Sequence, residues 1–138
     1  MIIEQTFSLD VINYVLKEPQ VWQEVCGQYN ELIEDIEPNL RDYIYLVGHV
    51  NMDIIGLFII HGSEYGYKCH VQVLPEHRKE HALEFGKKVI DWTWNNTDIN
   101  KLIALIPQKF PNVIGFAETQ GFKDLGPIGQ DHFMVLEK

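Results

Sequence analysis

The chain has 138 residues, of which 46% are hydrophobic and 22% charged, with a formal net charge of −9. This length and composition are typical of one globular domain over residues 1–138, and they exclude a disordered or collagen-like chain. The longest uncharged apolar run, Ile54–Ile60, is far shorter than the roughly 20 residues that span a bilayer. The first ten residues lack the pattern of a signal peptide, and two cysteines make no disulfide framework. We therefore expect a cytoplasmic protein with no membrane partner.

The charge is distributed unevenly along the chain. Residues 1–66 carry two basic and eleven acidic side chains, whereas residues 67–138 carry nine of each. The acidic total argues against a nucleic-acid partner, because phosphate binding needs a clustered positive surface. Two interpretations of the asymmetry stay open. One is a solvated acidic helical face near residues 31–37; the other is a second half that accepts an anionic ligand which the first half would repel.

The first stretch, to about Pro38, predicts two helices separated at Pro19. Ser8 is suited to cap the first helix, whose apolar residues follow helical spacing at Leu9, Ile12, Val15 and Leu16. The second helix carries its apolar side at Val21, Trp22, Val25, Tyr29, Leu32 and Ile33.

Three strands follow. β-Branched and aromatic residues favour a strand over 43–48. A turn is predicted over Val50–Asp53. A second strand follows over Ile54–His61, and its nearly continuous apolar run fits burial on both faces. The third strand, Tyr67–Leu74, ends at Pro75.

A helix is predicted from Glu76 to about Asn96. Leu83, Ile90 and Trp94 form one stripe on it, and Gly86 in its middle indicates a packing constraint. Trp92 lies about 200° around the helix from Trp94. We therefore expect that only one of them faces the core and that the other marks a protein contact.

The rest of the chain predicts strand, helix, strand and strand. Leu102–Ile106 is a strand, and Pro111–Gln120 a helix ended by Gly121. Phe122–Leu136 contains two strands joined by a turn at Gly126–Pro127. Taken together, the elements predict a mixed sheet with helices on both faces, in the α/β (α+β) class.

Two segments stand out in this order: Val73-Leu74-Pro75-Glu76-His77-Arg78 at a strand-to-helix junction, and Phe116-Ala117-Glu118-Thr119-Gln120-Gly121-Phe122 near the end. With these two segments, the order of elements over Ile54–Val135 resembles that of the GNAT acyltransferase superfamily. The resemblance implies a mostly antiparallel central sheet whose strands splay beside the Pro75–Arg78 turn. It also implies that acetyl-CoA lies in the splay between the strands 67–74 and 102–106.

The resemblance places the pyrophosphate of acetyl-CoA at the start of the helix, where backbone N–H groups converge. The cofactor-binding residues it implies are Val73, Arg78, Lys79, Glu80, His81, Ala82 and Leu83. The family pattern has glycines where this chain has His81 and Leu83. The Leu83 side chain could occupy phosphate space, and the Arg78–Glu80 turn could alternatively be a solvated first turn.

The sequence does not identify the catalytic residues, which stay unknown at this point. Ala117 stands where many members place a tyrosine as general acid, and Phe110 where many carry asparagine. The two central strands, 54–61 and 67–74, carry no carboxylate between their ends. His61 and His70 are the titratable alternatives for a base, although a histidine on a strand is commonly a packing or surface residue.

His77 and His81, spaced i, i+4, could place two imidazoles on one helix face beside Glu80 and Glu84. The HExxH order and a third ligand are missing, so we expect no metal.

The segment His70–Arg78, together with Asp91-Trp92-Thr93-Trp94, is most similar to the corresponding segments of small GNAT-like proteins of tailed bacteriophages. Two functions stay open: transfer of acetyl from acetyl-CoA to an amine substrate, or a non-catalytic role in head assembly or in the virion after loss of the acetyl-CoA site. The partners would be that amine or phage virion and assembly proteins, and self-association is left open.

Overall fold

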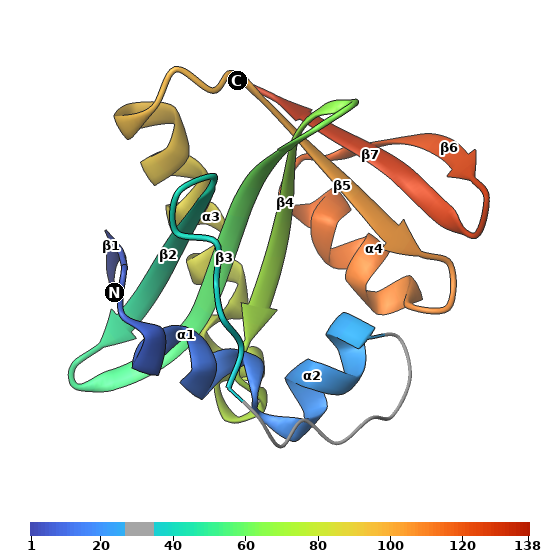
Figure 1. Ribbon diagram of the computed structural model, residues 1–138. Coiled ribbons are helices and arrows are strands. Elements are labelled where there is room, and N and C mark those ends of the chain that lie inside the picture. The colour runs from blue at the N-terminus through green and yellow to red at the C-terminus, as the bar shows by residue number, and fades with distance from the viewer. Residues whose placement is uncertain (27–34) are drawn as a thin grey trace.

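A seven-stranded sheet organises the computed structural model, which describes residues 1–26 and 35–138 (Figure 1). The described elements are β1 (Ile2–Gln5), α1 (Leu9–Leu16), α2 (Pro19–Cys26), β2 (Tyr43–Val50), β3 (Asp53–Ser63), β4 (Gly66–Val73), the 3-10 turn η1 (Pro75–His77), α3 (Arg78–Asn96), β5 (Lys101–Pro107), α4 (Pro111–Thr119), β6 (Lys123–Ile128) and β7 (Asp131–Glu137).

The strand order is β1-β2-β3-β4-β5-β7-β6, and β4–β5 is the parallel pair in an otherwise antiparallel sheet. The parallel pair arises because α3 crosses over between β4 and β5. The mixed, mostly antiparallel sheet is the one implied by the sequence. No helix within the described ranges combines the length and the apolarity that crossing a bilayer requires.

Two apolar layers cover the faces of the sheet. Helices α1 and α2 pack on one face through Ile12, Val15, Leu16 and Val21, against Tyr45, Val47, Leu57 and Ile59 of β2 and β3. Helices α3 and α4 pack on the other, where the buried residues include Leu46, Phe58, Phe85, Val89, Ala117 and Met134. Because both faces of β3 are covered, its apolar run is continuous, as the sequence predicted.

Several local predictions are confirmed. The hydroxyl of Ser8 accepts a hydrogen bond from the N–H of Val11 and caps α1. Gly121 ends the α4 segment with a φ of +102°. A Cβ at Gly86 would lie 2.8 Å from the Gln120 amide nitrogen and 3.1 Å from the Phe116 ring, so the glycine lies where α3 packs closely against side chains of the α4 segment.

The sequence predicts helical structure up to about Pro38, and this prediction is wrong at its start, where the chain forms strand β1. Residues Ile2–Gln5 pair antiparallel with β2, where Ile3 lies opposite Gly48. Three of the four β1 side chains are exposed, so the strand shows little local pattern and exists through pairing with a distant segment. Residues 35–39 are not helical, and the remainder of the predicted second helix, with Tyr29, Leu32 and Ile33, lies outside the described residues.

The turn prediction at Gly126–Pro127 is also wrong. These residues lie inside β6, where the register with β7 shifts between Asp124 and Pro127, and the chain reverses after Ile128 instead. A glycine–proline pair in a strand is compatible with such a bulge, because proline cannot donate to the ladder.

The expectations for α3 need two changes. Trp92 and Trp94 both pack, half-buried, against the same core, because the residue between them, Thr93, is the one at the centre of the buried face. The predicted stripe member Leu83 is 58% exposed and stands outside that core.

Candidate functional site

Strands β4 and β5 separate soon after they meet. Among the described residues they share one register pair, Lys68 opposite Ile103, near the start of both strands. Beyond it the strands diverge toward α2 and α4 (Figure 1). The polar backbone edge of β4 therefore lacks a partner strand along most of its length.

The direction of that backbone edge follows from two hydrogen bonds at the end of β4. The N–H of Leu74 donates to the carbonyl of Ile55 on β3, at 2.9 Å. The carbonyl of Val73 faces the other way and accepts from Nε of Arg78, also at 2.9 Å. Because backbone groups alternate along a strand, the N–H and C=O of Val71 face the side where β5 has diverged.

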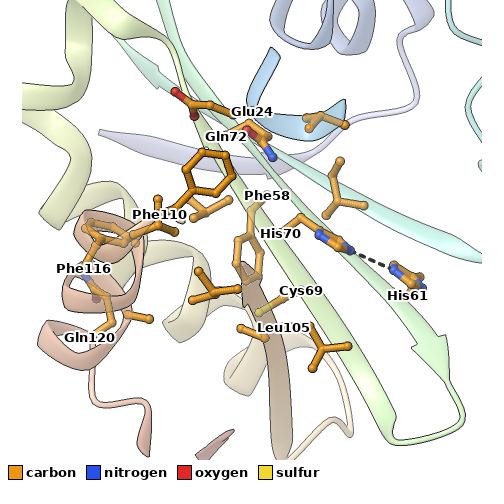
Figure 2. Close-up of a pocket in the computed structure, with 18 of the residues that line it drawn as sticks. Glu24, Phe58, His61, Cys69, His70, Gln72, Leu105, Phe110, Phe116 and Gln120 are labelled. Carbon is orange, nitrogen blue, oxygen red and sulfur yellow. Dashed lines mark hydrogen bonds between the residues drawn. The ribbon is translucent and has the colours of Figure 1, made fainter. Parts of the chain in front are cut away.

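A cavity of about 540 Å³ lies in this splay. Its apolar lining comes from β4 and β5, including Cys69, Val71, Ala104 and Ile106. Phe110, Phe116 and Gln120 close one end at α4, while Glu24 lies on another side and His61 and His70 on a third (Figure 2). The cavity therefore runs from the α3–α4 face of the sheet to the face covered by α1 and α2.

Two imidazoles meet at the wall of this cavity. Nε2 of His61 on β3 lies 3.0 Å from Nε2 of His70 on β4, and Nδ1 of His61 lies 3.0 Å from the Gly62 carbonyl oxygen. The rings are nearly parallel, with an angle of 6° between them. Burial, aided by the nearby His61 and Lys68, lowers the pKa of His70 to about 4. His70 is consequently neutral at neutral pH.

Aromatic rings extend the imidazole pair across the sheet. The Tyr43 ring on β2 stacks on His61 with centroids 4.5 Å apart. From α2, Trp22 also lines the cavity, and its buried Nε1 has no hydrogen-bond partner within the described part of the chain. A buried donor without a partner is uncommon in folded proteins, and at a cavity wall it suits a ligand acceptor atom.

Arg78 ties α2 to the start of α3. Its guanidinium makes a bidentate ion pair with Glu24, at 2.7 and 3.1 Å, in addition to the bond from Nε to Val73. Both side chains are one-third exposed, at 33%. Arg78, which the sequence implied as a cofactor-binding residue, is thus paired with a carboxylate that itself lines the cavity.

The structure places the other implied cofactor residues around the first turns of α3. Val73 is buried at the end of β4, Lys79 and Glu80 are exposed, and His81 and Ala82 are half-buried. The Leu83 carbonyl accepts a hydrogen bond from the Gln120 side chain. These residues surround the junction of β4 with α3, while the cavity itself receives Gly86 and Ile90 from that helix.

Ala117 and Phe110 both line the cavity at its α4 end. Neither side chain carries a proton that could be donated. The two positions at which the resemblance expects a tyrosine and an asparagine therefore lie at the cavity and offer no acid there.

The His77 and His81 rings do lie side by side, with centroids 5.6 Å apart. Each has a neighbouring carboxylate, Glu76 at 4.0 Å and Glu80 at 3.8 Å. Across residues 1–26 and 35–138, no three metal-ligating side chains come together.

Three residues of the site carried no sequence signal. Glu24, Trp22 and Tyr43 lie in segments whose patterns are those of an ordinary amphipathic helix and strand. Their contacts with Arg78, the cavity and His61 join residues at least 18 positions apart in the chain. Such contacts follow from the sheet order, which local patterns do not specify.

The sequence matches no protein-family model and no curated protein. Solved structures nevertheless resemble the chain over nearly all of its length. A spermidine N-acetyltransferase from Vibrio cholerae, in complex with CoA and spermine, is similar with a TM-score of 0.78 at 15% identity, covering 99% of this chain and 94% of that one.

The aminoglycoside acetyltransferase AAC(6')-Ib, in complex with paromomycin and acetyl-CoA, is similar with a TM-score of 0.79 at 11% identity, covering 99% of this chain and 92% of that one. At these identities the likeness concerns the fold. The chain has the GNAT fold, with the mixed α/β architecture that the sequence predicted.

Proposed function

We propose that the protein transfers an acetyl group from acetyl-CoA to an amine. The observation that carries the proposal is the splay of β4 from β5 over an apolar cavity, with the Val71 backbone facing into it. A cleft of this shape suits the thin, mostly apolar pantetheine arm, whose amides need backbone partners. When bound, acetyl-CoA supplies an activated thioester at the inner end of that arm.

The residues of the cavity fit such a cosubstrate. The Nε1–H of Trp22, which no described residue accepts, and the backbone of Val71 offer hydrogen bonds to carbonyl and amide groups. The N–H groups from Lys79 to Leu83 would hold the pyrophosphate at the positive end of α3, with Lys79 adding charge. His81 and Ala82 complete this first stretch of α3.

The acceptor amine would approach from the face covered by α1 and α2. Glu24, His70 and the Tyr43–His61 stack form that side of the cavity. Holding the amine next to the thioester supplies most of the rate enhancement, since proximity and orientation can contribute roughly 7–11 kcal/mol. The solved structures of similar fold were determined with amines such as spermine and kanamycin.

A second candidate is a GNAT-fold protein without turnover that serves assembly of a phage particle. Two observations favour it: the Arg78 guanidinium is engaged by Glu24, and Ala117 has no proton to give. In this case the cavity would be the remnant of an acetyl-CoA site, and the partners would be virion or head-assembly proteins.

Calorimetric titration with acetyl-CoA at low salt separates the two candidates. Transfer predicts binding in the micromolar range, followed by release of free CoA when an amine is added. Lys79→Glu should weaken binding about tenfold, equivalent to about 1.4 kcal/mol, because it places a negative charge beside the phosphates. Lys123→Glu, the same change at another exposed position, on β6, should have no effect. Absence of heat at millimolar acetyl-CoA would instead support the assembly role.

A further inference from the structure

We infer that His70 is the group that carries the proton during acetyl transfer. It would take the proton from the amine nitrogen and return it to the sulfur of the departing CoA, while His61 acts as a positioning residue. The inference rests on the proposed function and extends it to the acid–base chemistry. Figure 2 shows the hydrogen bond that joins the two rings.

The bonding partners define which ring nitrogens carry protons. The Gly62 carbonyl can only accept, so Nδ1 of His61, 3.0 Å away, must be the donor. With both rings neutral, Nε2 of His61 is then an acceptor, and the proton in the 3.0 Å contact belongs to Nε2 of His70. Nδ1 of His70 is left with its lone pair.

That lone pair is available for chemistry. The described part of the chain provides Nδ1 of His70 with no hydrogen-bond partner, and the residue lines the cavity. The charged and titratable groups that act on His70 are His61 and Lys68, and both disfavour its protonated form, as does burial. The resting ring therefore presents an unprotonated Nδ1.

His70 also stands next to the position expected for the reacting thioester. It directly precedes Val71, whose backbone faces the splay, and its own side chain is on the face of the sheet where the amine would enter. The Tyr43 ring stacks on His61 and holds the plane of the pair. One residue thus has access to both the nitrogen and the sulfur of the reaction.

The proton that leaves the amine and the proton that reaches the sulfur both pass through this one ring. The amine nitrogen forms a bond to the thioester carbon, and the carbon–sulfur bond breaks. Nδ1 of His70 accepts the proton that the nitrogen loses and then donates it to the thiolate sulfur, so the ring is neutral again after each turnover. A histidine that disfavours its protonated form gives up this proton readily, and Ala117 has none to offer.

The test compares amide substitutions at the two paired histidines, His70→Gln and His61→Asn. In His70→Gln, the amide nitrogen replaces Nε2 and keeps the bond to His61, but the Nδ1 lone pair is lost. His61→Asn keeps a donor near the Gly62 carbonyl and loses the acceptor for His70. His49→Asn is the matched control, because His49 is bonded to Glu4 and is absent from the cavity lining. Transfer is measured with acetyl-CoA and benzylamine, spermidine or kanamycin, and binding with CoA.

We expect kcat of His70→Gln to fall between about 100- and 10,000-fold, with the Kd for CoA unchanged. His61→Asn should lower kcat less and raise the pKa of His70 in an NMR titration. His49→Asn should behave as wild type. Nitrogen-15 NMR of the wild-type protein should show Nδ1 of His70 without a proton at pH 7.

Wild-type rates in His70→Gln, or a proton on Nδ1 of wild-type His70, would overturn the inference while leaving the proposed function intact. If the wild-type protein binds no CoA and acetylates none of the three amines, the proposed function fails and the inference fails with it.

Discussion

The burial that keeps His70 neutral in the folded protein also links stability to pH. Its pKa is about 4 when folded, against an ordinary value of 6.5, so the unfolded chain binds a proton at a higher pH. The contribution of His70 to the free energy of unfolding is therefore fully present above pH 6.5 and is lost as the pH falls toward 4. We expect a loss on the order of 2–3 kcal/mol from this group.

Urea unfolding at pH 7.0 and at pH 4.5 measures this effect. The difference between the two pH values should be smaller in His70→Gln than in the wild-type protein, because glutamine does not titrate. An equal pH dependence in both proteins would show that His70 is not buried in its neutral form.

Gly56 on β3 maintains the close approach of β4. A Cβ at this position would lie 2.5 Å from the backbone oxygen of Gln72, whereas a Cβ at Gly62 on the same strand would meet nothing within 4 Å. Gly56→Ala should destabilise the protein by about 1–3 kcal/mol, the usual range for overpacking. Gly62→Ala should change stability little; equal effects in thermal unfolding would refute this packing argument.

At the scale of elements, the Arg78–Glu24 pair connects α2 on one face of the sheet with α3 on the other. The two residues are 54 positions apart in the sequence, and Glu24 also lines the cavity in the β4–β5 splay. If the phosphates of CoA bind at the start of α3, they compete with Glu24 for the same guanidinium. Helix α2 then becomes an element whose contacts change when the cosubstrate enters.

Glu24→Gln tests this competition. The substitution should cost about 1 kcal/mol of stability, as for a partly exposed ion pair, and should tighten CoA binding about two- to tenfold by freeing Arg78. Glu118→Gln, at an exposed position of α4, serves as the control in the same calorimetric titration. Lower stability with unchanged affinity would mean that Arg78 makes no contact with the phosphates.

Secondary structure could be predicted from the sequence wherever an element carries its own pattern. The apolar run of β3, the cap at Ser8 and the packing glycine at Gly86 all have local signatures, and the structure confirms them. Strand β1 and the bulge at Gly126–Pro127 could not be foreseen, because each depends on pairing with a strand that a local pattern does not identify.

Across the whole molecule, the residues of the site also divide into those that have a local sequence pattern and those that enter the site only through the folded arrangement. The β4–α3 junction with Arg78 was visible as a motif, and His70 as a titratable residue on a central strand. Its partner Tyr43 and the carboxylate of Glu24 enter the site only through the order of strands in the sheet and the packing of α2. The chemistry of the cavity is consequently a property of the assembled fold.

The most direct test of the account is an amide NMR titration of the wild-type protein with CoA. If the cosubstrate binds between β4 and β5, the amide signals of Val71 and of Lys79 through Leu83 should move first and furthest. Signals from β1 and β6, at the two edges of the sheet, should remain in place. Saturating CoA that leaves Val71 and the start of α3 unmoved would contradict an acyl-CoA site in the splay.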